Sequence, residues 1–419
     1  MNHKLTRVLT LSLLIFCALT TAAQAQRKRS KPDPLKPAKP PQISFESGRS
    51  AVGIPFEFLG NIILVKARIN DSAPLKFIFD TGAGITVINE LRAKNLGLQP
   101  KSKVEVNGIG GSLNGVLLKE VALSLGGARV TSQVTAGLTF STFPCEMQDI
   151  DGVIGYDFIK EFVVELDYKA QTISLFDPQS YTYTGRGETI PLTITRTPRA
   201  RASLTLAGQR SAEGLFEIDT GSDGTLSVNT PFVKRHALLK ALNRRRESKS
   251  RGVGGKSANV QARVETFQLG SFVLKDPVVS FSVASKGAET KEDNDGPLGN
   301  EVLRRFKVTI DYTRQHMMLE PNESLSEPFE EEMSGIDFET GGAGCKTITV
   351  ESVTPNSPAS EAGILTGDVI QAIDGRTVET FTTTELEEIF RREGVEHTLV
   401  LSRGKQRMFQ VKFKTRRLI

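Results

Sequence analysis

The sequence predicts a mainly β chain in which two pseudosymmetric lobes are followed by a smaller α+β domain. The first observation is an acid–hydroxyl–glycine triplet that ends the apolar run Phe77 to Phe79 and recurs after Phe216 to Ile218. The second is that later landmarks recur in the same order with nearly constant spacing, as an internal repeat requires. The third is a new pattern of strands and turns after the acidic stretch Glu327 to Glu332, with a capped helix that should start at Thr382 and run to about Arg392.

Composition and the repeat suggest where the parts of the chain begin and end. They are a signal peptide at 1–25, a flexible basic Pro-rich tether at 26–42, an N-terminal lobe at 43–178, a C-terminal lobe at 179–321, an acidic linker at 322–333 and a last domain at 334–419.

The N-terminus is typical of a secretory signal. Lys4 and Arg7 precede the apolar segment Val8 to Leu19, and Ala23 to Ala25 is a small-x-small cleavage site. We expect an exported protein, periplasmic or secreted, without stable membrane insertion once the signal is cleaved; an uncleaved anchor is the less favoured alternative. The basic tether cannot bury apolar area, so we expect it to be flexible.

Composition bounds the chemistry of the 419 residues. The formal charge of +5 is mild and no concentrated basic face is evident, so no nucleic-acid partner is expected. Signal cleavage would remove Cys17 and leave Cys145 and Cys345, for which two thiols are favoured over a disulfide. Four histidines and two cysteines are too few for a metal cluster, so neither a metal nor a cofactor is expected.

In the first lobe, the sequence pattern predicts strands that end at an acidic residue. We expect a strand over Ile62 to Asn70, a turn, and a strand over Leu75 to Phe79, which leaves Asp80 at a strand-to-loop junction. Further strands are expected at Val116 to Leu118 and Val121 to Leu125. A glycine-rich hairpin tip precedes them, comprising Gly108, Ile109, Gly110 and Gly111.

An apolar-apolar-Gly turn, Val153 to Gly155, should open a short helix, and Phe162 to Asp167 with Thr172 to Phe176 should form a closing hairpin. The second half repeats these landmarks. Its expected hairpin tip comprises Gly252, Val253, Gly254 and Gly255, and its apolar-Gly turn is Pro297 to Gly299. Two charged segments, Arg244 to Arg251 and Lys286 to Asp295, break the symmetry and are expected to be solvated insertions.

The two halves resemble retropepsin-like aspartic proteases, over roughly Ile43 to Pro321. The resemblance rests on both Asp-Thr-Gly triplets, both Gly-x-Gly-Gly hairpins and both apolar-Gly turns. In retropepsins each subunit of a dimer supplies one triplet and one flap, whereas here one chain supplies both. The resemblance therefore implies an internal dimer with two flaps that close over a peptide.

Two carboxylates about 3 Å apart cannot both ionise easily, so they share a proton and can activate water. The resemblance implies that Asp80 and Asp219 form this catalytic pair. It also implies supporting roles for five residues, namely Thr81, Gly82, Thr220, Gly221 and Ser222. A turn residue after a strand is the plainer interpretation of either acid alone.

Ser222 marks a difference between the half-sites, because Ala83 occupies the matching position in the first. By resemblance, its hydroxyl donates a hydrogen bond to Asp219 and favours the ionised form. The resulting hypothesis is that Asp219 more often carries the charge and Asp80 the proton.

The last domain resembles PDZ domains of bacterial exported proteases, over about Ser334 to Phe413. The motifs are Ser357 to Ala359, Ala362 to Ile364, Gly367 to Ile370 and Ile373 to Gly375. The resemblance implies binding of C-terminal or extended peptides beside a carboxylate-binding loop of Gly335, Ile336, Asp337 and Phe338. Asp337 stands where glycine is common and would repel a terminal carboxylate if it pointed inward.

Together these patterns predict an exported aspartic endopeptidase that acts on peptides or proteins, with a PDZ domain for docking or regulation. The alternative is a catalytically inactive protease fold that serves as a PDZ peptide-binding module.

Overall fold

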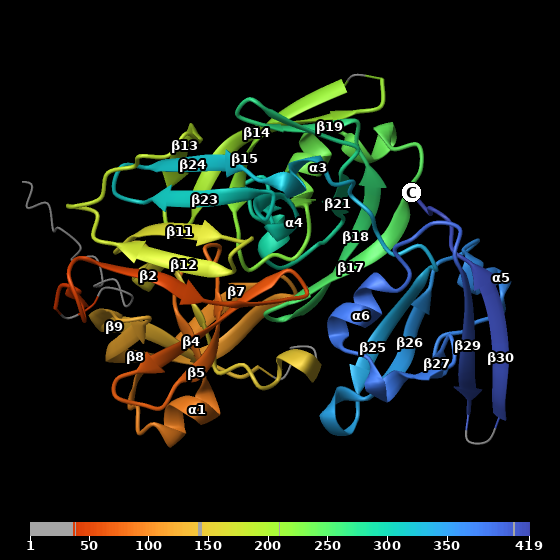
Figure 1. The fold of residues 1–419 in the computed structure, drawn as a ribbon, viewed down its shortest axis with the longest axis horizontal. Coiled ribbons are helices and arrows are strands. Elements are labelled where there is room, and N and C mark those ends of the chain that lie inside the picture. Colours follow the sequence, from red (N-terminus) through yellow and green to blue (C-terminus); the bar gives the residue numbers. More distant parts are fainter. Residues whose placement is uncertain (1–36, 38, 141–144, 209, 405–406) are drawn as a thin grey trace, which may run out of the picture. The chain divides into compact units, whose positions relative to one another are not determined.

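The computed structural model describes residues 37, 39–140, 145–208, 210–404 and 407–419 (Figure 1). The predicted signal peptide and most of the predicted tether lie outside these residues. The described chain is mainly β, as predicted. Within the same residues, no helix has both the length and the apolar character needed to cross a membrane.

The first lobe is built around the strand that ends at Asp80. β4 (Ile62–Ile69) pairs antiparallel with β5 (Leu75–Phe79), and β10 (Gly152–Ile154) lies parallel to β5. β6 (Val87–Asn89) runs antiparallel to β10 and parallel to β9 (Ala128–Leu138). The predicted strand over residues 75–79 is confirmed, and its alternate phenylalanines are buried in the core.

The second lobe repeats this arrangement strand for strand. β14 (Pro198–Leu206) pairs antiparallel with β15 (Arg210–Ile218), to which β22 (Pro297–Leu298) lies parallel. β16 (Leu226–Val228) runs antiparallel to β22 and parallel to β21 (Val278–Ser282). The predicted duplication of the fold is therefore confirmed at the level of strand pairing.

A shared sheet joins the two lobes, and its central strands are the two repeats of one element. The predicted closing hairpin of the first lobe is present, but the sequence did not predict that it would pair with its own repeat. The strands of this sheet, in spatial order, are β2 (Ser50–Pro55), β12 (Thr172–Phe176), β11 (Val163–Asp167), β23 (Phe306–Asp311), β24 (His316–Pro321) and β13 (Glu188–Ile194).

Two long hairpins carry the glycine-rich tips. Flap 1 consists of β7 (Pro100–Gly108) and β8 (Gly111–Leu125), and flap 2 of β17 (Arg246–Gly252) and β18 (Gly255–Arg263) (Figure 1, orange and green). The sequence predicted two separate strands where β8 is continuous. Around Val121 the pairing register between β8 and β9 shifts, but β8 itself continues without a break.

Short helices follow the strands of both lobes. α2 (Tyr156–Ile159) and α4 (Asn300–Leu303) begin after Gly155 and Gly299, at the two predicted apolar-Gly turns. One hydrophobic core cluster extends through both lobes. The remaining helices and strands of the lobes are α1 (Glu90–Asn95), α3 (Thr230–Arg235), β1 (Ile43–Phe45), β3 (Glu57–Leu59), β19 (Thr266–Leu269) and β20 (Phe272–Lys275).

The C-terminal domain has a hydrophobic core of its own. Its sheet runs in the order β25, β26, β27, β29, β30, so β25 is an edge strand. Thr382 and Glu385 form a capping box that starts α6, as predicted, but the helix ends at Glu388 rather than near Arg392. The elements are β25 (Ile336–Gly341), β26 (Thr347–Val353), α5 (Pro358–Glu361), β27 (Val369–Ile373), β28 (Arg376–Thr377), α6 (Thr383–Glu388), β29 (Glu396–Arg403) and β30 (Arg407–Lys414).

The acidic linker is docked on the second lobe. Phe329 is buried, and the guanidinium carbon of the fully buried Arg305 lies 3.7 Å from the centre of its ring. Arg246, expected in a solvated insertion, has only 10% of its side chain exposed and pairs with Glu331 and Glu332. That expectation was wrong because the partners of Arg246 lie more than 80 residues away.

The second expected insertion, Lys286 to Asp295, is also packed against the lobe. Glu289 in this segment is buried and accepts hydrogen bonds from the hydroxyls of Ser257 and Ser282. A buried carboxylate needs such donors, and they come from β18 and β21 rather than from neighbouring residues. The expectation was therefore wrong for Glu289, whereas Lys286, Lys291, Glu292 and Asp293 are exposed, as expected.

Cys145 and Cys345 form a disulfide, with their Cα atoms 5.7 Å apart. The bond joins the turn Cys145–Met147 of the first lobe to the turn Ala343–Cys345 of the C-terminal domain. The preference for two free thiols was wrong. The sequence separation of 200 residues gave no sign that the fold would bring these cysteines together.

Candidate active site

The fold brings the two Asp-Thr-Gly triplets together at the ends of β5 and β15. The amide of Asp80 donates to the carbonyl of Ile154 at 3.0 Å, and the amide of Asp219 donates to that of Leu298 at 3.0 Å. The two carboxyl groups are hydrogen-bonded to each other. Each acid is thus held by the strand parallel to its own, in the same way in both lobes.

The threonines of the triplets lock the two lobes together. The amide of Thr81 donates to Oγ1 of Thr220 and the amide of Thr220 donates to Oγ1 of Thr81, both at 3.0 Å. Each hydroxyl in turn donates to a carbonyl of the opposite lobe, Thr81 to Ile218 at 2.6 Å and Thr220 to Phe79 at 2.7 Å. Both threonines are fully buried, so every polar group of this network is paired.

The glycines of the triplets let each loop approach the other lobe's acid. A Cβ atom at Gly82 would lie 2.5 Å from Cγ of Asp219, and one at Gly221 would lie 2.4 Å from Cγ of Asp80. These distances are shorter than van der Waals contact, so any side chain at either position would displace a carboxyl group. The supporting positions predicted for both glycines lie beside the acids.

The two acids differ in the donors that they receive. Oδ1 of Asp80 accepts from the amides of Gly82 at 2.8 Å and Ala83 at 2.9 Å, whereas Oδ1 of Asp219 accepts only from Gly221 at 2.8 Å in the described hydrogen bonds. Such bonds favour the ionised form. Burial raises the pKa of Asp80 to about 6, and burial together with the charge of Asp80 raises the pKa of Asp219 well above its ordinary value. The additional amide donor at Asp80 therefore favours the charge on Asp80 and the proton on Asp219.

This assignment reverses the hypothesis based on Ser222. Among the described residues, the hydroxyl of Ser222 forms no hydrogen bond with Asp219. It is turned toward Gly299, where an added Cβ atom would lie 2.8 Å from it. The difference between the acids comes instead from the amide of Ala83, which residue types alone could not reveal.

The predicted flap tips meet each other. The amide of Gly110 in flap 1 donates to the carbonyl of Val253 in flap 2 at 3.1 Å. A Cβ atom at Gly110 would lie 2.4 Å from the carbonyl oxygen of Gly254, so only glycine allows this approach. Ile109 also packs near Gly252. That the tips cover a substrate remains a prediction.

Flap 2 is attached to the C-terminal domain by ion pairs. Arg251 lies 3.2 Å from a carboxylate oxygen of Glu339 in β25 and 2.9 Å from one of Glu351 in β26. Lys256 also pairs with Glu351, and Lys249 lies 3.9 Å from it. The strands next to the tip of this flap are therefore tied to β25 and β26.

The loop predicted to capture a peptide carboxylate is already occupied by this chain. The amides of Ser334 and Gly335 donate to the carboxylate of Glu332, and the amide of Ile336 donates to Oγ of Ser334 at 3.0 Å. Two of the four predicted binding residues thus have internal partners. Capture of a terminal carboxylate at these amides would require Glu332 and Ser334 to move.

The other two residues of the predicted loop lie on β25. Asp337 does not point into the loop, because its carboxylate accepts a hydrogen bond from Oγ of Ser352 at 2.6 Å. Phe338 packs against the domain core. β25 is an edge strand of its sheet, and the turn Cys145–Met147 and Arg251 of flap 2 contact it.

Sequence reasoning missed two residues beside Asp219. Glu217 precedes it by two positions on β15 and therefore shares its side of the strand. Arg199, almost fully buried on the neighbouring strand β14, faces Glu217 in the pairing register. The sequence did contain a signal for this pair, because residue 217 is an acid where the matching residue of the first lobe, Ile78, is apolar.

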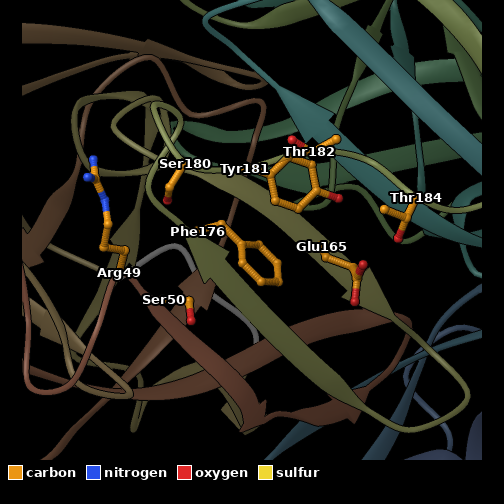
Figure 2. A pocket seen from close by; sticks show the side chains of 8 residues that line it. All are labelled: Arg49, Ser50, Glu165, Phe176, Ser180, Tyr181, Thr182 and Thr184. Atoms are coloured by element: carbon orange, nitrogen blue, oxygen red, sulfur yellow. The ribbon is translucent and has the colours of Figure 1, made fainter.

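A hollow of about 430 Å³ lies elsewhere, over the sheet shared by the lobes. Figure 2 shows Glu165, Phe176 and Tyr181 around it, with Arg49 at one side. The rings of Phe176 and Tyr181 lie 4.8 Å apart. No lining residue belongs to the triplets or flaps, so this hollow is separate from the candidate active site.

Comparison with known proteins agrees with both resemblances, to aspartic proteases and to PDZ domains. A family model described as "Aspartyl protease" matches residues 65–158, which include the Asp80 triplet and flap 1. Another, described as "PDZ domain", matches residues 349–403. No curated protein matches the chain. The chain therefore contains a retropepsin-like aspartyl protease domain, which its second lobe repeats in strand pairing, and a C-terminal PDZ domain.

Proposed function

We propose that this protein is an exported aspartic endopeptidase whose catalytic residues are Asp80 and Asp219. One observation carries the proposal: two Asp-Thr-Gly loops, cross-linked by the threonine hydrogen bonds, bring two partly buried carboxyl groups into hydrogen-bond contact. Two carboxyl groups that share one proton are the arrangement that this chemistry requires.

The difference between the acids suggests their roles. Ionised Asp80 takes a proton from a water molecule, whose oxygen attacks the scissile carbonyl carbon, and Asp219 donates its proton to the carbonyl oxygen. Collapse of the tetrahedral intermediate then breaks the C–N bond. Asp80 passes its proton to the leaving amine, and Asp219 takes back a proton from a hydroxyl of the intermediate, which restores the starting state of the dyad. The flaps would exclude bulk water during these steps.

The PDZ domain supports binding of extended peptide segments. Because Glu332 and Ser334 occupy the loop amides, we propose that a partner adds a strand along β25 rather than inserting its C-terminal carboxylate. Such a partner could be a substrate or a regulatory peptide.

Export is proposed from the N-terminal signal pattern, and the disulfide between Cys145 and Cys345 supports it. Disulfides persist in oxidising compartments such as the periplasm or the exterior.

The test is digestion of a proteome-derived peptide mixture by the purified protein. We expect cleavage by the wild type, inhibition by a pepstatin-type inhibitor, and loss of nearly all turnover in Asp80→Asn and in Asp219→Asn. Glu213→Asn, on the exposed part of β15, is the matched control and should cleave normally. A folded wild type that cleaves nothing would instead support the alternative of an inactive protease fold that presents a PDZ domain.

A further inference from the structure

The two lobes differ in the pair of residues that stands beside each catalytic acid. In the first lobe, Leu64 of β4 faces Ile78 of β5. In the second lobe, Arg199 of β14 faces Glu217 of β15. Ile78 and Glu217 occupy the same place, two residues before the acid. An apolar pair in one lobe thus corresponds to a charged pair in the other.

Glu217 lies on the dyad side of its strand. The residues on either side of it, Phe216 and Ile218, are fully buried in the core, so the alternation of the strand directs Glu217 to the opposite face with Asp219. Burial and the neighbouring acid Asp219 raise the pKa of Glu217 to about 8. The charge of Glu217 also contributes to the raised pKa of Asp80. A third carboxyl group therefore stands next to the dyad.

One oxygen of Glu217 is fully engaged by the second lobe. Oε2 accepts from Oγ1 of Thr197 at 2.7 Å and from Nδ2 of Asn294 at 3.1 Å, and Nε of Arg199 lies 4.0 Å away. In the described hydrogen bonds, Oε1 has no partner. The side chain of Glu217 is 14% exposed, so the carboxyl group is fixed at one oxygen and accessible at the other.

The positive charge of Arg199, beside Glu217, is neutralised by Asp293. Its guanidinium donates to the carbonyl of Asp293 at 2.5 Å and to the carboxylate of Asp293 at 3.2 Å. Apart from Arg199, the charged groups that act most strongly on Glu217 among the described residues are two acids, Asp219 and Asp293. A ligand group that approaches Oε1 therefore meets negative potential, which favours a cation.

We propose that Glu217, fixed by Thr197 and Asn294, forms a subsite that accepts a lysine or arginine side chain of the substrate next to the scissile bond. By the same comparison, the matching place in the first lobe, with Leu64 and Ile78, accepts an apolar side chain. This inference rests on the proposed protease function and adds the class of substrate to it. An ion pair with the substrate would hold Glu217 in its charged form.

The test uses peptides that differ only in the residues on either side of the scissile bond, with lysine, arginine, glutamine, glutamate or leucine at each. The quantity measured is the ratio of kcat/KM for the lysine peptide to that for the leucine peptide. We expect the wild type to prefer the basic peptides on one side of the bond, and Glu217→Gln to lower the ratio by about tenfold or more, equivalent to about 1.4 kcal/mol.

A second variant, Arg199→Leu with Glu217→Ile, copies the pair of the first lobe and should favour leucine. If this variant does not fold, Glu217→Gln decides alone, because glutamine keeps the shape and the hydrogen-bonding oxygen. Glu213→Gln, an exposed acid on the same strand, is the matched control and should keep the wild-type ratio.

The outcomes separate the two proposals. A wild type that cleaves peptides without preference for a basic residue, or a Glu217→Gln variant that keeps the preference, overturns this inference alone. A folded wild type that cleaves none of the peptides overturns the protease function and the inference together.

Discussion

The two flaps share one design but are held differently. In the described part of the chain, the strands of flap 1 form no ion pair with the PDZ domain. Flap 2 carries Arg246, Lys249, Arg251 and Lys256, and each of them pairs with an acid of the linker or of the PDZ domain. Movement of flap 2 must therefore break contacts that flap 1 does not have. Under the proposed function, these ion pairs couple the PDZ domain to catalysis through flap 2.

The centre of the molecule, unlike the two flaps, is nearly symmetric. Around the dyad, the backbone bonds of Asp80 and Asp219 and the threonine network match between the lobes to within 0.1 Å. The proposed chemistry needs both acids and so requires a symmetric centre, whereas the flaps and the residues beside the dyad can differ between the lobes. The predictions that follow test where symmetry holds and where it ends.

The largest effect is expected at the threonine network. Thr81→Ala and Thr220→Ala should each lower the free energy of unfolding by about 2–4 kcal/mol, because each leaves a buried amide and a buried carbonyl unpaired. Both should also lose most turnover, since the acids would no longer be held together. Chemical denaturation and kcat measurements check this.

The symmetry of the threonine network also predicts how the two alanine variants compare with each other. The two alanine variants should have equal effects, and the double variant should cost less than their sum, because both remove one shared network. Thr81→Ser and Thr220→Ser keep the hydroxyl and are the matched controls. Clearly unequal losses would show that the two halves of the network do not contribute alike.

A smaller effect is expected where the flaps differ. Glu339→Gln with Glu351→Gln removes the acids that hold Arg251 and Lys256, so flap 2 should spend more time open. The apparent affinity for substrate falls with the fraction of closed protein. Partly exposed ion pairs contribute about 1 kcal/mol or less each, so KM should rise about two- to fivefold.

Salt offers a second measurement of the same contacts. High ionic strength should raise the wild-type KM toward that of the double variant, because salt weakens exposed ion pairs. Glu361→Gln removes an exposed acid that pairs with Arg416 inside the PDZ domain and is the matched control. Equal KM values for all three proteins would mean that the PDZ contacts do not hold the flap.

The sequence predicted the features that follow from local pattern and repetition. The strand that ends at Asp80, the glycines of both flap tips and the helix start at Thr382 were all visible because each depends on residues within a few positions. The repeat extended the same prediction to the second lobe. These features are the ones that position the candidate site.

Apart from the pairing of the two Asp-Thr-Gly triplets, the sequence did not predict contacts between distant residues. Glu289 and Arg246 were read as solvated because their partners lie in other strands and in the linker. The disulfide and the pairing of Arg199 with Glu217 were missed for the same reason. Orientation was a further obstacle, since the residue type of Ser222 could not show that its hydroxyl turns away from Asp219.

The smallest expected effect concerns that hydroxyl. Under the proposed function, the dyad acts with one shared proton, and kcat/KM reports apparent pKa values that belong to the pair. Because burial raises the pKa of Asp80 to about 6, activity should fall as the pH drops below about 6 and Asp80 becomes protonated. Ser222→Ala removes no hydrogen bond to either acid, so both limbs of its pH profile should lie within about 0.3 unit of wild type. A rise of the acid limb by about one unit would mean that Ser222 does reach Asp219 in solution, because loss of a donor raises the pKa of its acceptor carboxylate. Asp219 would then be the charged partner, and the roles of the two lobes would exchange.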